Sequence, residues 1–458
     1  MDRVIIIGAG PSGLFAAGVL SQSGIPCVVI DSGHEMEDRE CPESAICRCA
    51  TCDILEGIGG AGGFSDGKNT YSLTRGTQME TIFDESNQKF LDLIDEITLM
   101  YGSEGVLYKP LDSPPSAFSE AGFQFESYPL RHIGSDGIRR FIESYAGHLR
   151  NSGVEILSLT DAKRLTQRGT DGKYSVLVQD LASSRLSTMR SDKVIIATGL
   201  HGSPWMEDQA HLLGIPLSSG PAGFGIRFEA RHETLASLFK SFYDFKLSKV
   251  YNDITFRSFC CNQRGWVLNE NHRLMGIRNV NGHSNIDEPH SNASNFAIIA
   301  KITKAIHPQP QDLVKSIAMQ INMAVDGGTV VQRARDFVAM RPTISDYFKV
   351  GESIRTNHQA RAAVDIGVFM PSQLRDGFRE FISDLDRIVP GILHSTSMVY
   401  APEVKYYGMK FPVDYGTWEC DGYPGLYVTG NASGYLDSFV SAALTGIIAA
   451  NHITEGGE

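Results

Sequence analysis

The stretch VIIIGAGPSGLFAAGVL, residues 4–20, holds most of the information about how this chain begins to fold. Residues 4–7 are apolar and β-branched without polar alternation, which predicts a strand buried on both faces of a parallel sheet. The glycine-rich turn that follows leads into a run of small and apolar residues, which predicts a helix. Residues 27–30 predict a second buried strand, and it ends at an acidic residue.

The glycines of this stretch have the GxGxxG spacing of a dinucleotide-binding loop. The first glycine makes the tight turn, the second lets a pyrophosphate approach the backbone, and the third lets helix and strand pack closely. The helix N-terminus supplies amide donors and the positive end of a dipole, and the acid accepts from ribose hydroxyls. The residues expected to hold the nucleotide here are Gly8, Gly10, Pro11, Ser12, Gly13, Asp31 and Ser32.

The bulk composition indicates a large globular α/β protein. A chain of 458 residues predicts two or three folding units. The net charge of −12 argues against nucleic acid or an anionic membrane as a partner. No apolar run is long enough to span a membrane, and the N-terminus lacks the pattern of a signal peptide, so a cytoplasmic location is expected.

The fingerprint alone does not choose between NAD and FAD, but the rest of the chain does. An apolar strand ends in Ala197-Thr198-Gly199, and a third strand lies at residues 424–431. A run of small residues, 434–446, follows and predicts a helix. This order resembles flavoproteins of the glutathione-reductase type, in which a C-terminal strand and helix return to cover the flavin. The resemblance implies FAD.

The same resemblance implies that the last helix points its N-terminus at the pyrimidine edge of the isoalloxazine. The positive end of its dipole then stabilises the negative charge of a reduced flavin. The alternative is an ordinary buried helix rich in Ala and Gly. The residues expected at the flavin from this segment are Gly430, Asn431, Asp437, Ser438, Phe439 and Val440.

The chain also resembles a more specific family, the bacterial uncharacterised FAD-dependent dehydrogenases among the NAD(P)/FAD-dependent oxidoreductases. The matching stretches are GGAGGFSDGK from Gly59, RHIGSDG from Arg131, ATG from Ala197, FGIRFE from Phe224, RSFCC from Arg257, NGHSN from Asn281, RPT from Arg341 and GLYVTG from Gly425. This resemblance implies an FAD-binding fold with an inserted, largely antiparallel substrate domain. It implies little about the substrate.

One stretch departs from the family pattern. Where the family is expected to read GEGAGYAGGI, this chain reads GNASGYLDSF from Gly430. Asn431 is still able to hydrogen-bond a ribityl hydroxyl, while Asp437 and Ser438 replace two small residues beside the flavin. We therefore expect a retained cofactor with altered chemistry.

The fold class expected from these features is α/β. It combines a Rossmann-like FAD-binding domain, with a parallel sheet and a β-meander, and an inserted, largely antiparallel α+β substrate domain. The expected boundaries are 1–75, 131–215 and 396–458 for the FAD domain, and 76–130 and 216–395 for the substrate domain. Helices are expected at 311–323 and 373–387, and antiparallel strands at 224–229 and 254–259. No second GxGxxG unit follows, so a dedicated nicotinamide domain is not expected.

The loop at residues 57–68 is expected to cross the cofactor, since it follows the second strand and is rich in glycine. A second nucleotide site is the weaker alternative, because the spacing is not that of a P-loop. The residues expected to contact FAD are Gly60, Ala61, Gly62, Gly63, Phe64, Ser65 and Lys68, with the backbone at Ala162 against the adenine.

Four cysteines precede this loop, namely Cys41, Cys47, Cys49 and Cys52. Their compact spacing leaves open a zinc or iron site, a redox disulfide, or unpaired thiols. The spacing is standard for neither metal, and no metal is predicted.

A set of charged residues lies at the family-like motifs of the inserted domain: Arg227, Glu229, Arg257, His283, Arg341, Glu403 and Lys405. Together they suggest a small anionic substrate, because arginine matches carboxylates and phosphates. The alternative is that they pair with other side chains of the protein. Asp437 and His283 are the candidates for proton transfer, and Arg341 and Arg227 complete the set of catalytic candidates.

The resulting prediction is an FAD-dependent dehydrogenase or reductase that passes a hydride between a small substrate and flavin N5. NAD(P)H or another electron partner is left open. The rivals are a flavin oxidase or monooxygenase and, from another class, an RNA-binding or scaffold protein with a structural flavin.

Overall fold

The computed structural model describes residues 3–41, 49, 52–74, 79–102, 105–111, 115–241, 243–283, 291–344, 361–362 and 364–456. The chain forms two compact units. The first unit contains residues 1–108, 129–220 and 407–458, and the second contains residues 109–128 and 221–406. Each has its own hydrophobic core.

The first unit is built on a five-stranded parallel sheet of order β21-β11-β1-β2-β7. These strands are β1 (Val4–Ile7), β2 (Cys27–Ile30), β7 (Glu155–Leu157), β11 (Val194–Ile196) and β21 (Leu426–Val428). All side chains of β1, β2, β11 and β21 are buried, which is why these runs are continuously apolar. The expected Rossmann-like sheet is confirmed.

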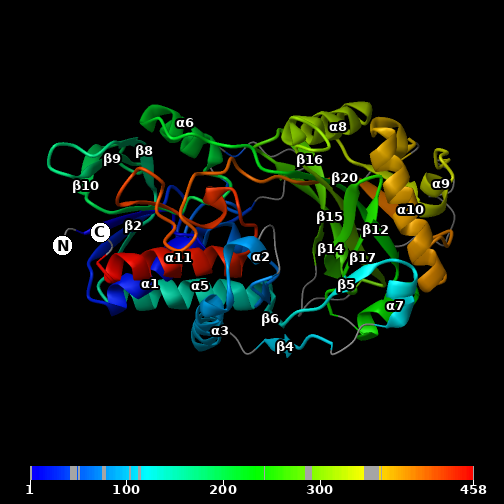
Figure 1. Cartoon of the computed structure of the whole chain (residues 1–458), viewed down its shortest axis with the longest axis horizontal. Coiled ribbons are helices and arrows are strands. Elements are labelled where there is room, and N and C mark those ends of the chain that lie inside the picture. The colour runs from blue at the N-terminus through cyan, green and yellow to red at the C-terminus, as the bar shows by residue number, and fades with distance from the viewer. Residues whose placement is uncertain are drawn as a thin grey trace. The chain divides into compact units, whose positions relative to one another are not determined.

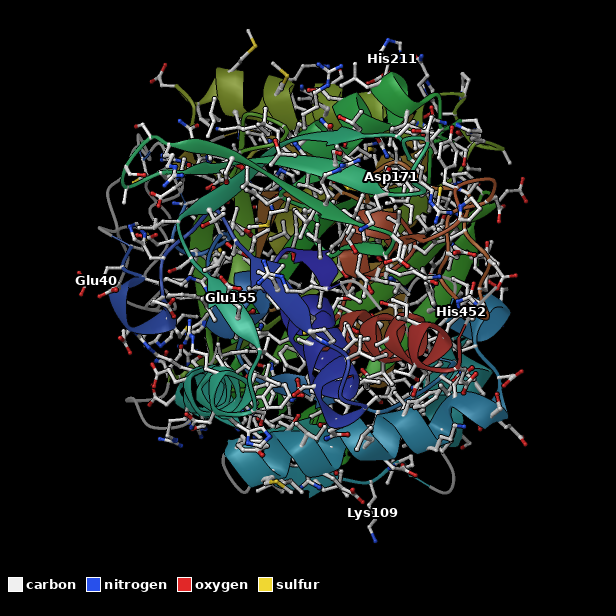
Figure 2. All side chains as sticks on the ribbon, turned by 90° about the vertical axis from the view of Figure 1, so that its left-hand side faces the viewer. Glu40, Lys109, Glu155, Asp171, His211 and His452 are labelled. Carbon is white, nitrogen blue, oxygen red and sulfur yellow. The ribbon has the colours of Figure 1, made fainter. Side chains whose placement is uncertain are left out.

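Helices pack beside this sheet, and Figure 1 shows α1 (Pro11–Gln22), α5 (Gly134–Asn151) and α11 (Phe439–Thr454) running side by side. In Figure 2, α1 and α11 again lie together, with His452 in the last turn of α11 and Glu155 on β7. The remaining helices of this unit are α2 (Met79–Ile82), α3 (Gln88–Tyr101) and α6 (Ser203–Leu213), with 3₁₀ turns η1 (Met36–Asp38), η2 (Gly60–Phe64), η3 (Glu85–Asn87) and η6 (Gly430–Ser433).

Two small antiparallel sheets complete the first unit. The expected β-meander consists of β8 (Thr160–Thr166), β9 (Tyr174–Asp180) and β10 (Leu186–Ser191). The second small sheet joins β3 (Lys68–Thr70), β6 (Leu130–His132) and β4 (Val106–Tyr108).

The second unit is an antiparallel sheet with helices, as expected for the inserted domain. Its eight strands have the order β19-β18-β20-β12-β17-β14-β13-β5, and only β18 and β19 pair in parallel. They are β5 (Gln124–Glu126), β12 (Ala222–Arg231), β13 (Lys246–Tyr251), β14 (Ile254–Asn262), β17 (Ala293–Ile302), β18 (Val330–Arg333), β19 (Arg361–Ala362) and β20 (Met398–Lys405).

A hairpin and several helices accompany this sheet. The hairpin consists of β15 (Trp266–His272) and β16 (Ile277–His283). The helices are α4 (Ser116–Glu120), α7 (His232–Ser241), α8 (Pro310–Ala324), α9 (Ala334–Val338) and α10 (Ser372–Ile388), with the 3₁₀ turn η5 (Ile366–Phe369). The predictions of helices at 311–323 and 373–387 are confirmed by α8 and α10.

The two faces of the large sheet differ in chemistry. Along β12, Phe224, Ile226 and Phe228 belong to the hydrophobic core that also contains the buried faces of α8 and α10. Because side chains alternate along a strand, Arg227 and Glu229 lie on the opposite face. That face therefore carries two of the charged residues that the sequence singled out, Arg227 and Glu229.

The division of the chain differs from the expected boundaries at three points. The strand β20 pairs with β12 and β18 in the antiparallel sheet, so the chain returns to the first unit at Tyr407 rather than at residue 396. The boundary near residue 216 lies at 220 instead. Of residues 76–130, only 109–128 belong to the second unit, because α3 buries Leu91 and Ile94 in the core of the first.

The last helix also begins later than expected. Gly434 has a φ of +84°, which does not fit a helix, and α11 starts only at Phe439. The described helices include none whose length and hydropathy would let it cross a membrane.

Candidate cofactor site and candidate substrate residues

The three glycines of the GxGxxG fingerprint differ in how much space a side chain would find. A Cβ on Gly8 would lie 2.4 Å from the carbonyl oxygen of Ala197, and one on Gly13 would lie 2.0 Å from the carbonyl oxygen of Gly8. A Cβ on Gly10 would meet nothing closer than the Cα of Gly60, at 4.0 Å. The protein itself therefore requires the outer two glycines and leaves open space at Gly10, as expected if a ligand approaches the backbone there.

The N-terminus of α1 lies at this open position. Gly10 is the N-cap residue, Pro11 opens the helix, and no side chain caps the amides of the first turn. These amides lack acceptors within the helix and carry the positive end of its dipole, so they suit an anionic group such as a pyrophosphate. Ser12 donates to the Thr429 hydroxyl at 2.8 Å, which fixes the start of α1 against the end of β21.

Asp31 binds backbone amides of three segments. One carboxylate oxygen accepts from Ala9 N at 2.8 Å, and the other accepts from Gly33 N at 3.0 Å and Gly57 N at 2.8 Å. Burial raises the pKa of Asp31, although these amides and Arg39 favour its charge. A carboxylate has about four acceptor positions, so one remains for the predicted ribose contact.

The glycines of the loop at 57–68 are explained by contacts within the protein. A Cβ on Gly62 would lie 2.8 Å from Pro11 Cγ and 2.9 Å from Phe439 Cδ2. A Cβ on Gly60 would lie 3.1 Å from the Cα of Gly10. The loop thus packs directly on the starts of α1 and α11, a reason that differs from the expected collision with flavin.

Arg39 holds this loop in place, and sequence reasoning did not identify it. Its guanidinium is buried and lies 4.7 Å from the ring centroid of Phe64. It donates to the backbone carbonyls of Asp53, Ile54, Ile58 and Gly60 at 2.7–3.1 Å. Burial lowers the pKa of Arg39 to about 10. Nothing in the local sequence pattern distinguished this arginine from an exposed one.

The ends of β11 and β21 bring two more predicted residues to the fingerprint. Gly8 packs on the backbone of Ala197, and Gly430 comes close to Ser12. Within the described part of the chain, Thr198 Oγ1 and Asn431 Oδ1 are buried without a hydrogen-bond partner. Unpaired buried polar atoms are rare in proteins, and a bound ligand would supply their partners.

The start of α11 lies beside the same loop, through Phe439. Ser438 is its N-cap and accepts from the backbone amide of Ser441 at 3.1 Å. Asp437 lies one residue earlier, 3.5 Å from the Tyr407 hydroxyl, which donates to it. Ser438, and not Asp437, therefore caps α11.

The other predicted cofactor residues have the following places in the fold. Lys68 forms an ion pair with Asp66 at 2.9 Å, and His132 hydrogen-bonds the Asp66 backbone. Burial and the Lys68 charge lower the pKa of His132 to about 4. Ser32 contacts Glu56 at 3.5 Å. The remaining residues are placed as follows: Ala61 and Gly63 on η2, Ser65 directly after it, Ala162 on β8, Gly199 after β11 and Val440 on α11.

Arg227 does not have the exposure that its predicted catalytic role requires. Its side chain is fully buried, and its Nε and Nη2 donate to the two carboxylate oxygens of Glu403 at 2.8 and 2.5 Å. Nη1 donates to Asn295 Oδ1 at 2.8 Å and to the carbonyl of Cys260 at 3.3 Å. The geometry makes Arg227 and Glu403 a structural pair of the second unit.

The other candidates of the second unit have partners of their own. Arg341 is largely exposed and bonds Asp336 at 2.8 Å, while His283 ends β16 opposite Trp266. Glu229 is buried, accepts from the Tyr400 hydroxyl at 2.5 Å, and has a pKa raised to about 7 by burial.

The cysteine cluster shows no metal geometry where it is described. Cys41 and Cys52 are free thiols, and Cys47 lies outside the described residues. Among the residues that the structure describes, no group of three or more His, Cys, Asp or Glu side chains is arranged to hold a metal ion.

A parallel sheet and an open glycine at the N-terminus of α1 define the class of protein as one that binds a dinucleotide. The match of residues 1–204 to the family model described as FAD binding domain agrees with this class. The matched part is somewhat less than half of the chain, and the description of the family model names FAD as the bound cofactor. FAD as the cofactor is thereby confirmed.

The chain is also similar to a protein of Clostridium beijerinckii described only as uncharacterized. The two are 22% identical, with 99% of this chain and 81% of the relative covered. Among solved structures, it is similar to a flavoprotein/dehydrogenase from Cytophaga hutchinsonii, with 12% identity, 100% and 80% coverage and a TM-score of 0.40. A glycine oxidase from Geobacillus kaustophilus has 12% identity, 100% and 95% coverage and a TM-score of 0.42. Likeness at this level carries no argument about the reaction.

Proposed function

We propose that the protein is a dehydrogenase or reductase that transfers a hydride between a small organic anion and N5 of its FAD. The observation that carries the proposal is the meeting of two helix N-termini at one loop. Pro11 at the start of α1 and Phe439 at the start of α11 both lie against Gly62. Two positive dipole ends in one place suit a cofactor that has an anionic pyrophosphate and gains negative charge on reduction.

FAD supplies the hydride chemistry, and the chain supplies binding, orientation and electrostatics. The first turn of α1 binds the pyrophosphate, and Asp31 accepts from the ribose. Asn431 Oδ1 and Thr198 Oγ1, buried without partners in the described structure, accept from or donate to the cofactor's polar groups. The amides of Phe439 and Val440 stabilise negative charge at the flavin.

Asp437 is the proposed proton-transfer residue of the first unit. Ser438 caps α11, whereas Asp437 Oδ2 accepts from the Tyr407 hydroxyl at 3.5 Å. A carboxylate so placed is able to accept a proton as hydride leaves a substrate. NAD(P)H or another electron partner would restore the flavin, and neither nucleic acid nor a membrane is proposed as a partner.

The test is anaerobic reduction of the purified yellow protein by a panel of organic acids and amines, followed through bleaching of the flavin absorbance. Asp437→Ala is expected to retain FAD and reduce the bleaching rate at least tenfold, while Asp437→Asn tests whether charge is needed. Rapid oxygen consumption with the same substrate would instead identify an oxidase or monooxygenase. If no compound of the panel and no nicotinamide reduced the flavin, the proposal would be wrong.

A further inference from the structure

Three cationic side chains of the second unit surround one aromatic ring. Lys405 Nζ lies 4.0 Å from the ring centroid of Phe259, Lys246 Nζ lies 4.8 Å from it, and Arg257 Cζ lies 5.7 Å from it. Each distance is within the range of a cation–π contact. Three cations around one ring repel one another, so their arrangement requires a compensating charge or interaction.

The acids of the surrounding strands compensate only part of this charge. Asp244 forms an ion pair with Lys246 at 3.2 Å. Glu403 interacts electrostatically with Lys405, but both of its carboxylate oxygens already accept from Arg227. Among the described residues, neither Arg257 nor Lys405 forms an ion pair with an acid.

The sheet is built so that these two cations reach the same place. Arg257 and Phe259 are two residues apart on β14, so their side chains share a face. Lys405 belongs to β20, which is separated from β14 by β12 and β17. Lys405 pairs with Gly223 of β12. A Cβ on Gly223 would lie only 2.9 Å from Lys405 Cβ. A glycine at position 223 is therefore needed for the lysine to extend toward Phe259.

The side chains of Arg257, Phe259 and Lys405 are partly accessible to solvent. The side chains of Arg227 and Lys246, which are paired with acids, are buried. A partly exposed pair of cations beside a hydrocarbon ring matches an organic anion. Its carboxylate or phosphate would lie between Arg257 and Lys405, and its apolar part would contact Phe259.

We propose that Arg257, Lys405 and Phe259 form a binding subsite for the anionic group of an organic acid. The identification of this acid as the substrate rests on the proposed function. The subsite replaces Arg227 and Arg341 as the anion-binding residues, since the first is enclosed and the second is paired with Asp336 at the surface.

The test is isothermal titration calorimetry of the FAD-loaded protein with benzoate and, separately, with phenyl phosphate. Arg257→Gln and Lys405→Gln are each expected to weaken binding of at least one probe tenfold or more. The matched control is Lys315→Gln, which removes the same charge from α8, whose buried residues pack on the opposite face of the sheet. Arg257→Lys should recover part of the affinity.

The two probes distinguish a carboxylate from a phosphate as the recognised group. The inference is overturned if neither probe binds, or if both variants bind as the unaltered protein does. Its failure is distinguishable from that of the proposed function. Binding that depends on Arg257 and Lys405 without any flavin reduction by organic acids would leave the subsite standing. Flavin reduction by organic acids, together with probe binding that is unchanged in both variants, would leave the function standing and remove the subsite.

Discussion

At position 10, the cofactor explains why the residue is glycine, because packing within the protein does not require it. Its φ of −73° is accessible to any residue, and a Cβ there would find open space. We expect Gly10→Ala to keep the unfolding temperature of the FAD-free protein within about 2 °C and to weaken FAD binding at least tenfold. FAD titration by quenching of flavin fluorescence measures the second effect.

Gly13→Ala is the matched control, because the same added methyl group would meet a backbone oxygen at 2.0 Å. That variant should lose stability in the FAD-free protein, by roughly 1–3 kcal/mol as for other overpacked sites. Equal losses of stability in the two variants would show that Gly10 is also there for packing.

Glu229 makes the stability of the second unit depend on pH. Its pKa is about 7 in the fold, against about 4.3 in an unfolded chain. A raised pKa means that the folded state holds the proton more tightly, so the stabilisation is complete below the unfolded value and is lost as the pH rises through about 7.

The variant Glu229→Gln, which is always neutral, isolates this effect. The free energy of unfolding of the unaltered protein should fall relative to that of the variant between about pH 5 and about pH 8, by up to about 3 kcal/mol. Urea unfolding at both pH values measures it. A constant difference across the range would mean that Glu229 does not titrate there.

At the scale of elements, η2 is packed between the starts of α1 and α11. Gly62→Ala would place its methyl group against Pro11 and Phe439, so we expect a lower unfolding temperature even without FAD. Phe439→Leu removes one of the two contacts, and the double variant should regain part of the loss. Differential scanning calorimetry of the FAD-free proteins measures both steps.

Gly147→Ala on α5 serves as the control for a glycine without neighbours, since nothing lies within 4 Å of its added Cβ. It should be neutral or slightly stabilising. If the Gly62→Ala, Phe439→Leu double variant regained stability but still failed to bind FAD, the glycine would be needed for cofactor binding as well as for packing against Phe439.

At the scale of the whole molecule, two units with separate cores should respond differently to FAD. A ligand at a hundredfold excess over its Kd stabilises the fold that binds it by about 2.7 kcal/mol. We expect hydrogen exchange in residues 8–14, 57–64 and 429–441 to be faster in the FAD-free protein. Exchange in α10, which packs within the second unit, should not change.

Mass spectrometry of deuterium uptake, with and without FAD, checks this prediction. Equal changes in both units would mean that FAD binding stabilises the molecule as a whole. Protection confined to α10 would place the cofactor outside the first unit and contradict the site described above.

The buried strands β1 and β2, the fingerprint and helices α8 and α10 were predictable because each depends on neighbours in sequence. Periods of two or 3.6 residues and the GxGxxG turn are local patterns. The unit to which β20 belongs was not predictable in this way. An apolar strand is compatible with either sheet, and only its pairing with β12 and β18 assigns it to the second unit.

The sequence by itself determined that this chain begins with a dinucleotide-binding domain, because a turn, a helix start and the strands beside them specify a nucleotide site locally. The roles of individual charged residues were decided only by the tertiary structure. Arg39 and Arg227 look like any other arginine in the sequence, yet both are buried and bind groups that are distant along the chain. Whether an arginine stabilises the fold or faces a ligand depends on which acceptors the fold places within reach, and that is a property of packing.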